Sequence, residues 1–165
     1  MSVLPDWLMP GLTLVFCGTA AGTASARRGH YYAGPGNRFW PMLFETGLTP
    51  RRFAPEEDHL LPTLGIGLTD LCNTTFGPDA KIPRQSFDPD GLFRRVNLAR
   101  PRLLAFTSLT AARLALGRPR LGPGPIPPDA RLPGTTLWAL PSPSGLARAT
   151  FDPHPWHALA KEAAR

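Results

Sequence analysis

The stretch TLVFCG, residues 13–18, decides the fold of this chain. It is a short, mostly apolar run that ends at a glycine, which is typical of a buried parallel strand entering a loop. Comparable runs follow at residues 66–72 (IGLTDLC), 102–107 (RLLAFT) and 135–140 (TTLWAL). We therefore expect four strands in one sheet.

Helical patterns separate these runs. Asn37 and Asp152 are capping residues that can begin a helix, and Gly47 and Gly117 can end one. Strands that alternate with helices predict an α/β fold, a three-layer α/β/α arrangement around a mostly parallel sheet of four strands, within a single domain covering residues 1–165. The expected helices are residues 37–46, 90–99, 110–116 and a final one with Pro153 at its first position.

One long segment interrupts the alternation of strands and helices. Residues 118–133 contain six prolines. Because proline cannot donate to a strand ladder, we expect this segment to be an irregular surface loop.

Composition indicates which partners and cofactors are compatible with the chain. Eighteen Lys and Arg against twelve Asp and Glu give a net charge of +6, and all of the basic residues except Lys81 and Lys161 are arginines. The planar guanidinium group of arginine can bind a phosphate through two hydrogen bonds, which favours a nucleic-acid partner. An arginine-rich surface without such a partner explains the charge equally well. Cys17 and Cys72 are too few for a thiolate cluster. Without a long apolar run or a signal peptide, we expect a cytoplasmic protein with no membrane contact.

Three loops follow the expected strands, where parallel sheets bind their ligands. They are residues 18–37, 70–86 and 141–150. The first combines glycines with arginines and tyrosines but lacks a phosphate-binding glycine motif, so no nucleotide cofactor is expected. The last, LPSPSGLAR (140–148), places a leucine between small polar residues and an arginine. Such a leucine suits a wedge that enters stacked DNA bases, or it packs locally in a turn.

Two of these segments resemble a known family. Residues 10–40, PGLTLVFCGTAAGTASARRGHYYAGPGNRFW, are similar to the start of the mismatch-specific uracil/thymine DNA glycosylases, in the uracil-DNA glycosylase superfamily. That family writes its first motif GINPG, followed by N-x-F-W, and LPSPSGLAR resembles its second motif, NPSGLSR. The resemblance implies an α/β/α fold, extrusion of a nucleotide from DNA into a pocket, and excision of uracil.

The resemblance also implies roles for single residues. Tyr32 matches the aromatic residue that stacks on the flipped base, and Ser142 lies where the family often has an asparagine that contacts the substrate. Leu146 matches the wedge, with Gly145 and Arg148 beside it at the DNA. Backbone N–H groups near Thr19, Ala20 and Tyr32, together with the Ser142 hydroxyl, would stabilise the departing base. His30 belongs to the same segment and either contacts the base or DNA, or packs.

The sequence departs from the family at the catalytic position. Ala20 stands where the family has the asparagine of GINPG, and alanine cannot orient water. Asp70 in GLTDL is the best replacement, because a carboxylate at the end of the second strand can accept a proton from water and stabilise a cationic sugar. The alternative is that Asp70 caps the following turn at Asn73 and Thr74.

Other functions stay open at this point. A lesion-binding or abasic-site-binding protein would keep the pocket and wedge without turnover. A serine hydrolase using Ser142 or Ser144 with His154 or His157 would lack the G-x-S-x-G motif. We expect no bound metal, since the histidines are not spaced as metal ligands. We also expect a monomer that binds double-stranded DNA. Whether it acts on single-stranded DNA and on bases other than uracil stays open.

Overall fold

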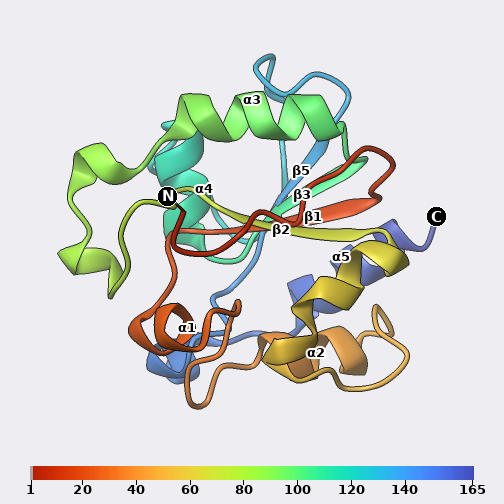
Figure 1. Cartoon of the computed structure of the whole chain (residues 1–165). Coiled ribbons are helices and arrows are strands. Elements are labelled where there is room, and N and C mark those ends of the chain that lie inside the picture. The colour runs from red at the N-terminus through yellow and green to blue at the C-terminus, as the bar shows by residue number, and fades with distance from the viewer. Residues whose placement is uncertain (1) are drawn as a thin grey trace.

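A five-stranded sheet forms the centre of the computed structural model, which describes residues 2–165 (Figure 1). The strand order is β2-β1-β3-β5-β4. Strands β2, β1, β3 and β5 are parallel, and β4, at the edge of the sheet, pairs antiparallel with β5. The strands are β1 (Leu14–Gly18), β2 (Ile66–Asp70), β3 (Leu103–Phe106), β4 (Gly124–Ile126) and β5 (Thr136–Ala139).

The expected α/β fold with a mostly parallel sheet is confirmed, with one correction. The sheet has five strands rather than four, because the proline-rich segment contributes β4. Proline is tolerated on an edge strand, where one side of the ladder has no partner. Pro125 is exposed at this edge, opposite Trp138. The prediction that the prolines exclude all regular structure is therefore wrong for these three residues.

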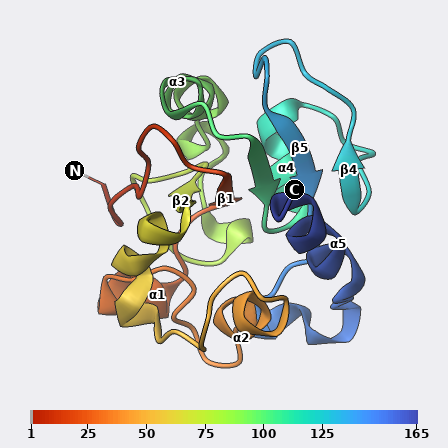
Figure 2. The same ribbon diagram turned by 90° about the vertical axis from the view of Figure 1, so that its right-hand side faces the viewer.

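Helices cover both faces of the sheet. In Figures 1 and 2, α3 and α4 lie on one face, and α1, α2 and α5 lie on the other. Each face has its own apolar cluster: Val15 and Cys17 point to the first face, and Phe16 to the second. The helices are α1 (Thr23–Arg28), α2 (Phe39–Glu45), α3 (Pro89–Ala99), α4 (Leu109–Leu116) and α5 (His154–Ala163).

Local side chains fix where these helices begin. Asn37 Oδ1 accepts the Phe39 N–H at 2.9 Å, and Asp152 Oδ1 accepts the His154 N–H at 3.0 Å. Both residues thus bind the first residue of a helix, but the expectation that they are the N-caps is wrong by one position. The N-cap is Arg38 in α2 and Pro153 in α5, so α5 begins at His154 and not at Pro153. Within residues 2–165, five helical segments were not expected. They are α1 within the glycine-rich loop and the short 3₁₀ segments Pro55–Leu64, Asp79–Lys81, Arg84–Ser86 and Gly145–Thr150. No helix within residues 2–165 is both long and apolar enough to span a bilayer.

The docking of α5 depends on one tryptophan. Trp156 is fully buried, and its ring centroid lies 5.9 Å from that of Phe16 in β1. Its indole N–H donates to the Pro141 carbonyl at 3.0 Å, immediately before Ser142. The helix therefore anchors the loop after β5 as well as the core.

Replacing Trp156 with alanine should lower the free energy of unfolding by about 3–5 kcal/mol, because it leaves a large cavity and an unpaired carbonyl. Urea unfolding measures this loss. Leu98→Ala is the control: Leu98 is 80% exposed on α3, and its loss should cost less than about 0.5 kcal/mol. Equal effects of the two substitutions would contradict the packing role.

Candidate functional site

A cavity of about 880 Å³ opens at the carboxyl ends of the parallel strands. All three loops that the sequence singled out contribute to its walls, and so do Thr107 and Ser108 after β3, which sequence reasoning missed. Their position directly after a buried strand was the available signal. The cavity brings together eight of the nine residues expected at the site: Thr19, Ala20, Tyr32, Asp70, Ser142, Gly145, Leu146 and Arg148.

Asp70 is the last residue of β2 and is 3% exposed. It lies opposite Gly18 in the sheet register. A Cβ atom on Gly18 would lie 2.6 Å from Asp70 Oδ1, 3.3 Å from the Tyr32 hydroxyl and 3.4 Å from Thr107 Oγ1. Three polar side chains therefore converge over Gly18, and only glycine leaves room for them.

This environment disfavours the charged form of Asp70. Burial raises the pKa of Asp70 well above its usual value, and the negative charge of Asp6 raises it further. A backbone hydrogen bond from Gly18 and the charge of Arg95 act in the opposite direction without compensating. Within residues 2–165 the Asp70 carboxylate makes no hydrogen bond to Asn73 or Thr74, as the turn-capping alternative would need.

The backbone of Asp70 is held by a network behind the cavity. Arg95 of α3 donates from Nη2 to the Asp70 carbonyl at 2.8 Å, and its Nε lies 2.9 Å from Asp6 Oδ2. Thr69 donates to the other Asp6 oxygen at 2.7 Å. The end of β2 is thus tied to α3 and to the N-terminal segment, which limits how far Asp70 can move.

Tyr32 forms another wall of the cavity. Its φ of +53° is in the left-handed region, which is uncommon for an aromatic residue and often marks a functional site. Its ring stacks on Phe39 with centroids 3.9 Å apart, and its hydroxyl lies 3.0 Å from Thr107 Oγ1. Burial first and then the nearby Asp70 raise the pKa of Tyr32, so its hydroxyl stays neutral. One ring face is covered by Phe39, and the ring is fixed in place.

The loop after β5 presents an exposed leucine. Leu146 is 92% exposed, which excludes local packing of its side chain. Its N–H donates to Ser144 Oγ at 3.2 Å, and Ser142 Oγ accepts the Ser144 N–H at the same distance. A Cβ on Gly145 would lie 2.7 Å from the Pro35 carbonyl oxygen, so the loop packs tightly against the first loop.

The histidines lie outside this arrangement. His30 is the one expected site residue that does not line the cavity. Its Nδ1 lies 3.2 Å from both oxygens of Asp58, so it packs beside the Tyr31–Tyr32 turn. His154 pairs with Asp152 and His157 with Glu45, rather than with a serine. Across residues 2–165 no cluster of three or more His, Cys, Asp or Glu could hold a metal ion.

Comparisons with known proteins agree with this geometry. The family model described as the uracil DNA glycosylase superfamily matches residues 5–162. The chain is also similar to a solution NMR structure of a candidate uracil DNA glycosylase from Methanosarcina acetivorans. The TM-score is 0.66 and the identity 24%, over 98% of this chain and 97% of that chain. At this identity, the structural match shows a shared fold.

The raised pKa of Asp70 predicts a stability cost that depends on pH. An unfolded aspartate ionises at about pH 3.9, whereas folded Asp70, with its raised pKa, stays protonated to a higher pH. Between the two pKa values the folded state binds more protons, so stability falls as pH rises. Asp70→Asn does not titrate, and its stability relative to the unsubstituted protein should therefore increase from pH 4 upward. Urea unfolding at several pH values measures this, and a difference that does not vary with pH would refute it.

Proposed function

Because this chain belongs to the uracil DNA glycosylase superfamily, we propose that it removes uracil from DNA by hydrolysing the N-glycosidic bond. The observation that carries the proposal is a buried carboxylate, Asp70, lining a cavity whose rim presents the exposed Leu146. Because residues 10–40 and 140–148 resemble the mismatch-specific enzymes, we propose that the chain belongs to that group of the superfamily. One chain supplies every residue in the scheme, so we propose a monomer that acts on DNA in the cytoplasm.

Asp70 takes the role that Ala20 cannot fill. As a carboxylate, it accepts a proton from the attacking water and stabilises the positive charge that develops on the sugar as the base departs. The low dielectric around it strengthens this electrostatic effect. Its position is supported by the Arg95 hydrogen bond to its backbone, which keeps the carboxylate at the cavity wall.

Free donors around the cavity suit the departing uracil anion. Within residues 2–165 neither the Ala20 N–H nor the Tyr32 N–H donates to a protein acceptor. Ser142 Oγ accepts one hydrogen bond, which leaves its own proton for a ligand. Thr19 differs, because its hydroxyl donates to Asp79 Oδ1 at 2.6 Å and joins the first two loops. We propose that its backbone contributes to the base pocket.

Leu146, Arg148 and Tyr32 lie where they could contact the DNA. Leu146 would enter the space left by the flipped nucleotide, while Arg148 and the net charge of +6 attract phosphates. Tyr32, backed by Phe39, would stack on the flipped base through its uncovered face. Since Ser142 replaces a larger amide, thymine, hypoxanthine, xanthine and etheno adducts are further candidate bases.

A second function is favoured by the burial of Asp70. Its raised pKa favours the neutral acid, which is a weaker base than a carboxylate. A protein that binds lesions or abasic sites without efficient cleavage would keep the same cavity and wedge. Single-turnover assays on uracil-containing duplexes distinguish the two functions, because binding without excision supports the second.

Asp70→Asn should lower the rate of single-turnover uracil excision by roughly 10²-fold or more, because amide nitrogen and oxygen cannot accept the proton. Asp90→Asn, on the exposed side of α3, is the matched control and should retain the rate. Excision at an unchanged rate in Asp70→Asn would remove Asp70 from the chemistry.

Leu146→Ala should reduce excision from duplex DNA more than excision from a single strand. A wedge holds open a base stack that single strands lack. Its exposure means that the substitution leaves the fold intact, which thermal unfolding verifies. Equal losses on the two substrates would show that Leu146 is not a wedge.

A further inference from the structure

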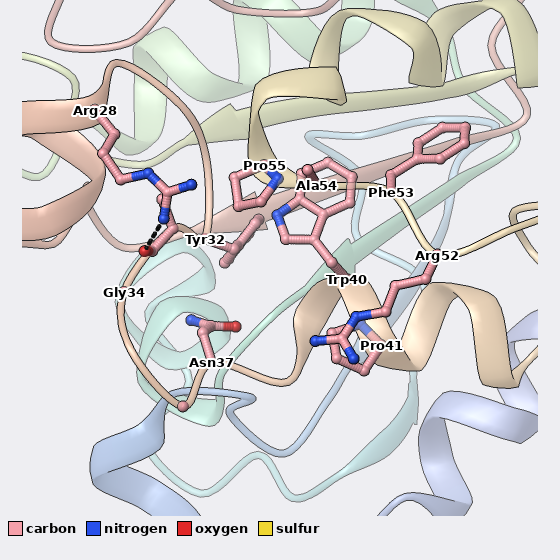
Figure 3. A pocket seen from close by; sticks show the side chains of 12 residues that line it. Arg28, Tyr32, Gly34, Asn37, Trp40, Pro41, Arg52, Phe53, Ala54 and Pro55 are labelled. Atoms are coloured by element: carbon pink, nitrogen blue, oxygen red, sulfur yellow. Dashed lines mark hydrogen bonds between the residues drawn. The ribbon is translucent and has the colours of Figure 1, made fainter.

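A second hollow of about 450 Å³ lies beside the cavity (Figure 3). The two spaces share one wall, formed by Tyr32, Gly34, Gly36 and Asn37. Trp40 and Phe53 line the hollow, and both are nearly fully buried. Nothing in the proposed excision chemistry uses this space.

Two side chains of the hollow have hydrogen-bond donors to spare. Arg52 is exposed, and within residues 2–165 its guanidinium forms no ion pair or hydrogen bond. The Asn37 oxygen accepts the Phe39 N–H, and among the described residues 2–165 its amide nitrogen donates to no acceptor. Figure 3 shows both side chains directed toward the hollow.

Arg28 at the opposite side is already committed. Its guanidinium pairs with Glu56 at 2.6 Å and donates to the Ala33 carbonyl at 2.9 Å, the bond drawn in Figure 3. Glu56 already pairs with this guanidinium, and the bond to Ala33 ties Arg28 to the segment that forms the shared wall. Of the two arginines that line the hollow, Arg52 is therefore the one whose guanidinium is available to a ligand.

We propose that this hollow binds a backbone phosphate of the DNA strand that carries the flipped nucleotide. A guanidinium and an amide N–H are suitable partners for phosphate oxygens. The segment that contains the shared wall also supports the wedge loop, since the N–H of Arg38, next to Asn37, donates to the Pro143 carbonyl at 2.8 Å, and Gly145 packs on Pro35. A strand that delivers its base into the cavity crosses this rim. The inference rests on the proposed function.

Arg51 provides a matched control for Arg52. It is adjacent in the sequence, but it is paired with both Glu57 oxygens and lies over the Phe53 ring with its guanidinium carbon 4.7 Å from the centroid. It does not line the hollow. Arg51→Gln and Arg52→Gln change the net charge equally, so a difference between them reports a local contact rather than the long-range field.

The first experiment measures the Kd for a duplex containing a tetrahydrofuran abasic-site analogue, over a range of salt concentrations. Arg52→Gln should weaken binding several-fold and reduce the slope of log K against log salt by about 1, the value for one lost phosphate contact. Arg51→Gln should leave both quantities nearly unchanged. Arg52→Lys keeps the charge without the fork and should restore the slope but only part of the affinity. Equal behaviour of Arg51→Gln and Arg52→Gln would overturn the inference.

A second experiment locates the phosphate. Single phosphates of the lesion strand are replaced by uncharged methylphosphonates, one position at a time. One position near the lesion should weaken binding by the unsubstituted protein but not by Arg52→Gln. If no position behaves in this way, the hollow does not bind a backbone phosphate.

Failure of the inference and failure of the proposed function give different results. Uracil excision by the unsubstituted protein, with Arg51→Gln and Arg52→Gln alike in binding, refutes the phosphate site and leaves the glycosylase intact. A protein that neither binds nor excises uracil-containing DNA refutes the proposed function, and the phosphate site with it.

Discussion

The Asp70 carboxylate is held out of water over the Cα atom of Gly18, where two neighbouring parallel strands end side by side. Desolvating a carboxylate disfavours its ionisation, and its pKa is raised accordingly. The surrounding structure must supply the hydrogen bonds and the packing that keep it there. Arg95, which pairs with Asp6, donates to the Asp70 carbonyl behind β2, and the hydrogen-bonded Tyr32 and Thr107 side chains lie over the same glycine at the front of the cavity.

The burial of Asp70 has opposite consequences for the stability of the fold and for the proposed reaction. A buried carboxyl group that stays neutral is a poor base, whereas the same group, once ionised, acts strongly on nearby positive charge because little water screens it. The sugar of a departing base develops such a charge, which would itself favour ionisation of Asp70. Access of the substrate to the cavity and the protonation of Asp70 are thus coupled in the proposed reaction.

The segment from Tyr32 to Arg38 links the features of the site. It contributes the tyrosine wall of the cavity, supports the loop that carries Leu146, and borders the hollow that contains Arg52. The positive φ angles of Tyr32 and Gly36 allow the chain to turn twice within a few residues. A shift of this segment would therefore move the stacking surface and the wedge together.

The sequence by itself determined the parallel strands, most helices and the three loops at their carboxyl ends, because apolar runs and capping residues act locally. It did not determine β4, whose pairing depends on a free edge of β5. It named Asp70 but could not show its burial, and it missed Thr107, whose contact with Tyr32 joins residues 75 positions apart. It also could not show that His30 lies beside Asp58 and outside the cavity. Only the tertiary structure brings such distant residues together, since each contact depends on the packing of separate elements.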